Sequence, residues 1–167
     1  MAPLLAERIG GEWIDLDRAV EESAGITIAA LIESRGEAAF RDLESEALSR
    51  ALATPAPVPR VLACGAGLLG RAENREWLRE WAFVAWLSVT PETAAARLGA
   101  GAVLLRPLLR GASPVERLRE YESERRERYA EAADVTVEAD RRSALEVAAV
   151  VAEAWRERQG RWERSES

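Results

Sequence analysis

Two carboxylates one residue apart, Asp15 and Asp17, are the first candidates for chemistry in this sequence. They follow the apolar run Trp13-Ile14, which predicts a buried strand. Ligands of open parallel α/β sheets bind beyond the carboxyl ends of the strands, so acids placed there would project into a ligand crevice, where phosphate and metal chemistry can occur. The alternative is structural, because Asp at such a position often caps the helix that follows. Taken alone, the Asp-x-Asp pattern favours the structural interpretation.

Three arginines are the next candidates. Arg41 would flank the buried face of a predicted helix, Arg106 precedes a proline, and Arg125 lies in a strongly charged helix. Arginine suits bidentate recognition of carboxylate and phosphate groups. The structural alternatives are an exposed ion pair between Arg41 and Glu37, four residues earlier, and a solvated charged face around Arg125.

A turn of small residues, Gly65-Ala66-Gly67, follows the predicted strand over 61–64. Small residues let the main chain approach a ligand, so the backbone N–H groups of this turn could bind an anion or a hydroxyl. The alternative is an ordinary tight turn, which is the better interpretation of this segment taken alone.

Composition excludes several classes of function. The 167 residues suit one domain, and the net charge of −6 argues against nucleic acid as a partner. The single cysteine, Cys64, and the absence of histidine exclude an internal disulfide, Ser-His and Cys-His nucleophiles and the usual zinc sites. No apolar run suits a membrane span or a secretory signal. We therefore expect a cytoplasmic monomer with one domain over 1–158 and a charged tail over 159–167.

The elements that must position these candidates follow from apolar periodicity, caps and breakers. Helices are predicted over 4–9, 17–24, 27–36, 37–52, 74–81, 114–132 and 143–155, and after Thr90. Strands are predicted near 13–15 and over 61–64, 83–89 and 135–137. The regular alternation of strand and helix in the second half predicts a parallel sheet flanked by helices.

The order and spacing of the candidate motifs resemble those of the shikimate kinases. The matching motifs are Asp15-Leu16-Asp17, Gly36-Glu37-Ala38-Ala39-Phe40-Arg41, Gly65-Ala66-Gly67, Arg106-Pro107-Leu108-Leu109, and Glu124-Arg125 ahead of Tyr129. The resemblance runs from about Leu5 to Trp155. It implies a P-loop kinase fold of the nucleoside monophosphate kinase type. It also implies the activity of that family, which is Mg²⁺-dependent transfer of the γ-phosphoryl group of ATP to the 3-hydroxyl of shikimate.

The resemblance also implies a role for each matching acid and arginine. Asp15 resembles the acid near the magnesium ion. Asp17 resembles the acid that binds the shikimate hydroxyls and positions or deprotonates the attacking one. Arg41 and Arg125 match the two arginines that hold the shikimate carboxylate.

Further matches concern the small-residue turn and ATP. Gly65, Ala66 and Gly67 match a triple-glycine turn that contacts shikimate through its backbone, with alanine here in place of the middle glycine. Arg106 matches an arginine that reaches the ATP phosphates. Arg142 lies in the region that borders the adenine.

The sequence departs from the family pattern at its N-terminus. It contains no Gly-x-x-x-x-Gly-Lys-Ser/Thr loop and no lysine, although such a loop cradles the phosphates in P-loop kinases. The strand that precedes the loop is central in the family's sheet, between the strands that here cover 61–64 and 83–89. Without it, these two strands must either close up or leave unpaired backbone groups in the core. We expect the chain as written to have negligible kinase activity.

Several interpretations remain open on the sequence alone. The chain is a shikimate kinase truncated at its N-terminus, for instance by a start codon placed too late, or a non-catalytic descendant that binds a small hydroxy acid or a protein partner. A sugar or nucleoside kinase relative is a third interpretation, but a neutral sugar needs no pair of arginines for a carboxylate. A purely structural α/β domain is the remaining possibility.

Overall fold

The computed structural model describes the backbone of residues 1–104 and 113–165, and side chains over 1–98 and 113–160. The elements in chain order are α1 (Ala2–Ile9), β1 (Glu12–Asp15), α2 (Leu16–Ala24), α3 (Ile28–Ala53), β2 (Arg60–Ala63), the 3₁₀ helix η1 (Leu68–Gly70), α4 (Ala72–Trp81), β3 (Ala85–Ser88), α5 (Pro91–Leu104), α6 (Pro114–Ala132), β4 (Val135–Glu138) and α7 (Ala144–Ser165). The predicted α/β class with parallel strands flanked by helices is confirmed.

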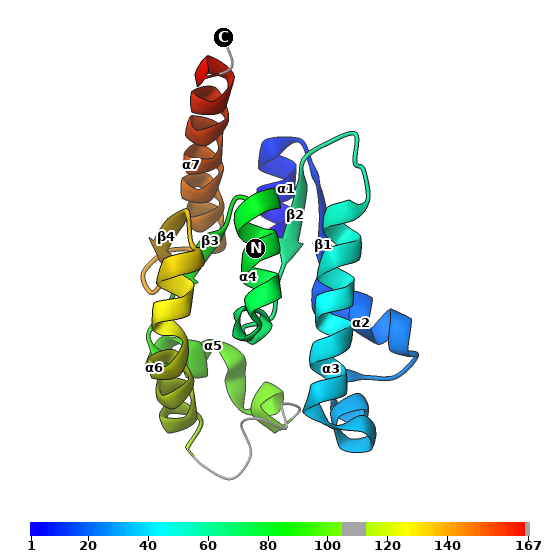
Figure 1. The fold of residues 1–167 in the computed structure, drawn as a ribbon. Coiled ribbons are helices and arrows are strands. Elements are labelled where there is room, and N and C mark those ends of the chain that lie inside the picture. The colour runs from blue at the N-terminus through cyan, green and yellow to red at the C-terminus, as the bar shows by residue number, and fades with distance from the viewer. Residues whose placement is uncertain (105–112, 166–167) are drawn as a thin grey trace.

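The strands of the described residues form two separate parallel pairs. β1 pairs with β2, with Trp13 opposite Val61, and β3 pairs with β4, with Trp86 opposite Thr136. No pairing joins β2 to β3 within the described residues. Figure 1 shows the β3–β4 pair on the left, the β1–β2 pair on the right, and α4 between them. The sequence analysis allowed two outcomes for β2 and β3: the two strands close up, or they stay apart. In the described residues they stay apart.

Local signals explain most helix ends. Gly10 and Gly25 end α1 and α2 in the left-handed conformation, at φ 68° and 70°, which glycine adopts without a Cβ clash. The Thr27 side chain accepts from the backbone N–H of Ala30 and begins α3. Gly36, at φ 83° and ψ 165°, interrupts α3, where the sequence predicts one helix ending and another beginning.

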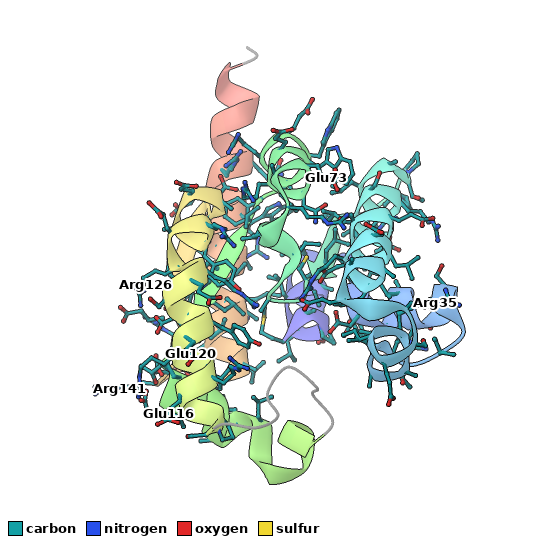
Figure 2. All side chains as sticks on the ribbon, turned by 60° about the horizontal axis from the view of Figure 1, so that its bottom comes forward. Arg35, Glu73, Glu116, Glu120, Arg126 and Arg141 are labelled. Atoms are coloured by element: carbon teal, nitrogen blue, oxygen red, sulfur yellow. The ribbon has the colours of Figure 1, made fainter. Side chains whose placement is uncertain are left out.

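Three apolar clusters form the core of the part of the chain whose side chains the structure describes. Leu5 of α1 packs with Val137 of β4 and Val151 of α7 in one cluster. Leucines of α2, α3, η1 and α4 form the second, and Val20, Leu31 and Phe40 form the third. α6 contributes no buried residue, and Figure 2 shows its labelled Glu116, Glu120 and Arg126 along the outside of the molecule.

Two elements differ from the sequence-based expectations. β1 is not a buried strand, because Trp13 is 45% exposed. Among the residues that the structure describes, β1 pairs only with β2, and its face is only partly covered. α7 continues to Ser165 instead of ending near Trp155, and its far end projects beyond the other elements in Figure 1. Within the described residues, no helix combines the length and the apolar character that a membrane crossing requires.

Candidate functional site

Asp15 and Asp17 lie where β1 passes into α2. Asp15 Oδ1 accepts hydrogen bonds from the backbone N–H groups of Asp17 at 3.0 Å and Arg18 at 3.3 Å. Asp15 therefore caps α2, as the structural interpretation of the Asp-x-Asp pattern predicts. Asp17 stands on the first turn of α2 and lies beside Gly65, where an added Cβ would come within 3.1 Å of Asp17 Oδ1.

Arg41 on α3 bonds two glutamates of the same helix. Its Nη1 donates to Glu44 Oε2 at 2.8 Å, and its Nη2 donates to Glu37 Oε1 at 2.9 Å. The Arg41 side chain is 17% exposed and that of Glu44 only 1%. The predicted pair with Glu37 is present, but the bond to Glu44 makes Arg41 part of a buried cluster. The guanidinium group carries five N–H donors, and its hydrogen bonds to these two glutamates use three of them.

Glu44 is a buried acid with one unsatisfied oxygen. Its Oε1 is inaccessible to solvent and has no hydrogen-bond partner among the described residues. Burial raises the pKa of Glu44, the bond and charge of Arg41 oppose that shift, and the nearby Asp17 adds to it. Burial alone would lower the pKa of Arg41, but the hydrogen bonds and charges of Glu44 and Glu37 outweigh it and the net shift is upward. We conclude that Arg41 stays charged beside a carboxylate that is costly to keep ionised.

In the turn after β2, a side chain at the first or third position would displace the ends of neighbouring side chains. A Cβ on Gly65 would lie 2.8 Å from Glu44 Oε1, and a Cβ on Gly67 would overlap the guanidinium group of Arg41. These close approaches bring the backbone of the turn against α2 and α3. Ala66, between the two glycines, is exposed, so a methyl group is accommodated there.

α6 holds the same turn from the other side. Tyr129 Oη donates to the backbone oxygen of Ala66 at 2.5 Å, and Arg125 Nη1 donates to the same oxygen at 3.3 Å. The Arg125 guanidinium also lies over the Tyr121 ring, 4.4 Å from its centroid. A cavity of about 190 Å³ opens between α3 and α6, and Arg41, Gly67, Arg125 and Tyr129 line it. The structure therefore brings both candidate carboxylate-binding arginines to one cavity.

Cys64 immediately precedes the turn. Although part of the residue is exposed, burial of its thiol raises the pKa to about 12, and the charges of Glu44, Asp17 and Asp15 add to the shift. The thiol is therefore protonated at neutral pH. A nucleophilic role for Cys64 is not supported, because the thiolate is the reactive form.

The structure does not test the two predicted ATP-binding arginines. Arg106 lies outside the described residues. Arg142 follows β4, is exposed, and donates to the backbone oxygen of Glu138. Both assignments stay predictions.

Asp15 offers little as a metal site by itself. Its Oδ1 is occupied by the α2 cap, and its Oδ2 has no hydrogen bond from the described part of the protein. Across residues 1–98 and 113–160, no group of three or more His, Cys, Asp or Glu side chains could hold an ion. One free carboxylate oxygen nevertheless suits Mg²⁺, which proteins often bind through one or two carboxylates together with substrate phosphates.

Sequence reasoning missed two residues of the cluster. Glu44 carried a detectable signal, because Arg41 and Glu44 are three residues apart and so share a helix face. Its burial and its contact with the Gly65 turn could not be read from that spacing. Tyr129 was recognised only as a motif neighbour of Arg125, and its bond to Ala66 spans sixty-three residues of sequence.

The parallel strands, the flanking helices and a site at the carboxyl ends of β1 and β2 define an α/β protein of the P-loop kinase type. Comparison with known proteins makes this specific. The family model described as shikimate kinase matches residues 1–156, so the chain belongs to the shikimate kinase family.

Individual relatives agree with this assignment. The chain is 44% identical over 155 residues to a shikimate kinase of Symbiobacterium thermophilum, covering 93% of this chain and 87% of the relative. It is 40% identical over 137 residues to a shikimate kinase of Paracidovorax citrulli, covering 82% and 73%.

Solved structures show the same fold. The shikimate kinase from Acinetobacter baumannii in complex with shikimate aligns with a TM-score of 0.83 at 31% identity, covering 90% of this chain and 81% of that one. The shikimate kinase from Bacteroides thetaiotaomicron aligns with a TM-score of 0.76 at 23% identity, covering 95% and 89%, which shows the fold alone.

Proposed function

We propose that the cluster at the ends of β1 and β2 is the shikimate-binding site of a kinase that uses ATP to phosphorylate the 3-hydroxyl of shikimate. The observation that carries the proposal is the cavity lined by both Arg41 and Arg125. Two guanidinium groups at one small cavity suit a carboxylate substrate, because each offers a planar pair of donors. A neutral sugar would leave these charges unmatched.

Each residue of the cluster has a role in this proposal. Arg41 and Arg125 hold the substrate carboxylate. Asp17, next to the turn, accepts from the substrate hydroxyls and positions or deprotonates the attacking one. Backbone groups of the Gly65-Ala66-Gly67 turn contact the ring. Family membership and the 31% identical structure solved with shikimate support this arrangement.

ATP and Mg²⁺ belong to the proposal through family membership. Asp15 would help to hold Mg²⁺, which would neutralise charge on the phosphates, and Arg106 and Arg142 would contact ATP. The 167 residues contain neither a Gly-x-x-x-x-Gly-Lys-Ser/Thr loop nor any lysine. Because that loop supplies the backbone cradle and the cation for the phosphates, we propose that this polypeptide alone binds shikimate but transfers phosphate negligibly.

A second candidate function is a non-catalytic protein that binds a small hydroxy acid or a protein partner, and the alanine between Gly65 and Gly67, where the family has a third glycine, favours it. Binding of gluconate or other hydroxy acids as tight as that of shikimate would favour it over the first. We further propose that the protein is a cytoplasmic monomer. Light scattering on the purified protein tests its oligomeric state.

Calorimetric titration of the 167-residue protein with shikimate tests the site, and a coupled assay with shikimate, ATP and Mg²⁺ tests catalysis. We expect saturable 1:1 binding and no turnover above background. Arg41→Lys keeps the charge but loses the paired, coplanar N–H donors of the guanidinium group. The Kd of this variant for shikimate should therefore rise about tenfold or more. Arg50→Lys is the matched control, because Arg50 lies on the same helix in an exposed pair with Glu46.

The outcomes separate the two parts of the proposal. Failure of the native protein to bind shikimate overturns the assigned site. Measurable phosphorylation of shikimate overturns the predicted inactivity and leaves the site assignment intact. An equal effect of Arg41→Lys and Arg50→Lys would remove Arg41 from the proposed carboxylate clamp.

A further inference from the structure

Arg125 carries a positive charge that no acid in the described part of the chain neutralises. Its guanidinium group forms no ion pair there, although Glu122 and Glu124 lie within one helical turn of it. Glu122 is bonded by Arg126 instead. Arg41, the other arginine of the small cavity, is bonded to two glutamates. Arg125 therefore keeps its whole charge for a ligand.

One hydrogen bond joins the Arg125 guanidinium group to the main chain. Its Nη1 donates to the backbone oxygen of Ala66 at 3.3 Å, which is longer than the usual range of about 2.7–3.2 Å. The same oxygen accepts the shorter bond from Tyr129 Oη. Because arginine has a long and flexible side chain, a single long bond does not fix the plane of its guanidinium group.

The ring of Tyr121 supplies a second contact. Its centroid lies 4.4 Å from Arg125 Cζ, well within the limit of about 6 Å for a cation–π contact. Tyr121 and Arg125 are four residues apart on α6, so they lie on one face of that helix. Both side chains are half-buried, and shielding from water strengthens a cation–π contact. The ring therefore restrains the guanidinium group.

An aromatic ring restrains Arg125 without neutralising it. A carboxylate at position 121 would bond the guanidinium group and compete with a substrate carboxylate for its N–H donors. The ring attracts the cation through its quadrupole and carries no net charge, so the donors at the guanidinium edge stay available. Tyr121 is not among the described residues that line the small cavity. Its influence on a ligand in that cavity therefore passes through Arg125.

We propose that Tyr121 is a positioning residue for Arg125: its ring holds the guanidinium group in the plane from which two N–H donors meet the substrate carboxylate. This inference rests on the proposed shikimate site. It assigns different supports to the two arginines, acids of α3 for Arg41 and an aromatic ring of α6 for Arg125. Because bidentate bonding needs a defined plane, loss of the ring should weaken binding of the carboxylate.

Calorimetric titration of the 167-residue protein with shikimate tests the proposal on two variants. Tyr121→Phe keeps the ring, so its Kd should stay within about twofold of the native value. Tyr121→Leu keeps an apolar side chain of good helix propensity but removes the ring face, so its Kd should rise about threefold to tenfold. The thermal midpoint of both variants should stay close to that of the native protein, because α6 contributes no buried residue.

A double-mutant cycle separates positioning of Arg125 from any other effect of the ring, since Tyr121 also lines a wider cavity beside the site. Arg125→Gln should by itself raise the Kd about tenfold or more. In that background Tyr121→Leu should change the Kd by less than about twofold, because no guanidinium group remains to be positioned. Arg117→Gln is the matched control: Arg117 Cζ lies 5.7 Å from the centroid of the same ring, and its loss should leave the Kd unchanged.

Three binding results would overturn the proposal. Tyr121→Leu could bind as tightly as the native protein while Arg125→Gln binds weakly. Tyr121→Phe could lose as much affinity as Tyr121→Leu, which would assign the effect to the hydroxyl. Tyr121→Leu could weaken binding equally with and without Arg125, which would show that the ring does not act through the arginine.

Nuclear magnetic resonance of the free protein keeps this test separate from the proposed function. Failure of the native protein to bind shikimate overturns the assigned site, whereas stacking is measured without ligand. The ring current of Tyr121 should move the Arg125 Nε–H proton signal upfield in the native protein and in Tyr121→Phe, and the shift should disappear in Tyr121→Leu. Arg125→Gln assigns the signal. An Nε–H signal at the same position in all three proteins would show that the ring does not hold Arg125.

Discussion

The hydroxyl of Tyr129 donates to the backbone oxygen of Ala66 at 2.5 Å. This bond ties α6 to the turn that follows β2, and Arg125, one helical turn before Tyr129, donates to the same oxygen. The turn is therefore fixed on one side by α6 and on the other by the close approach of Arg41 to Gly67. Its backbone can face a ligand only while α6 keeps this position.

Tyr129→Phe is predicted to weaken shikimate binding without unfolding the protein. The variant keeps the ring and its contact with Trp86, whose centroid lies 5.6 Å away, and removes only the hydroxyl. Loss of one hydrogen bond of this kind costs about 0.5–1.5 kcal/mol, so we expect the Kd to rise about threefold to tenfold. Calorimetric titration measures it, with the thermal midpoint as control. An unchanged Kd would show that Tyr129 does not position the turn.

Glu44→Ala is predicted to destabilise the fold because it leaves Arg41 without its buried partner. Arg41 keeps its bond to Glu37 and is partly exposed, so we expect a loss of about 1–3 kcal/mol in the free energy of unfolding. Urea unfolding measures the difference.

The matched control for that variant lies on the same helix. Glu46 pairs with Arg50, and both side chains are more than half exposed. Glu46→Ala should therefore change the free energy of unfolding by less than about 1 kcal/mol. Equal losses in the two variants would mean that burial of the Arg41–Glu44 pair has no energetic consequence.

Local chemistry explains why much of the fold could be predicted from the sequence. The capping box is an example: Ser143 Oγ accepts from the backbone N–H of Glu146 at 3.3 Å, and a Glu146 carboxylate oxygen accepts from the backbone N–H of Ser143 at 2.7 Å. Both partners lie within one helical turn, so residue types and spacing are sufficient. The same holds for Gly10 and Gly25, which end helices.

Properties that depend on distant segments were harder to predict. Trp13 lies in an apolar run, yet its exposure is decided by what packs over β1, which the run does not encode. Glu44 looks like a surface residue of a charged helix, but the Gly65 turn covers it. The open sheet was foreseen only as one of two outcomes, because the resemblance indicated a missing strand and not how the remaining strands would respond.

Asp140 gives a pH-dependent prediction. It follows β4 and accepts from the backbone N–H of Thr90 at 3.0 Å and from Thr90 Oγ1 at 2.7 Å. Hydrogen bonds from the Thr93 and Thr90 side chains, and then from the Thr90 backbone, lower its pKa from 3.8 to about 2. A pKa lowered by folding stabilises the protein above the unfolded value, and this stabilisation is lost as the pH falls through the folded value.

Asp140→Asn should therefore lower the thermal midpoint at pH 7, and the difference from the native protein should shrink between about pH 4 and pH 2. Thermal unfolding of both proteins over this range measures it, because changes common to both cancel in the difference. A difference that stays constant down to pH 2 would show that ionisation of Asp140 does not contribute.

The last prediction concerns alkylation of Cys64. Because the chain has one cysteine, any cysteine alkylation that is measured occurs at Cys64. Burial, followed by the charges of Glu44, Asp17 and Asp15, raises the pKa of its thiol from 9.0 to about 12. Only the thiolate reacts with iodoacetamide, so the folded protein should be alkylated at least a hundredfold more slowly at pH 7.5 than the urea-unfolded chain. Its rate should rise about tenfold per pH unit up to pH 10 without a plateau, whereas the unfolded chain should level off near pH 9. Asp17→Asn should speed alkylation of the folded protein by removing one nearby charge, and equal rates for folded and unfolded chains would show that the thiol is not held in this environment.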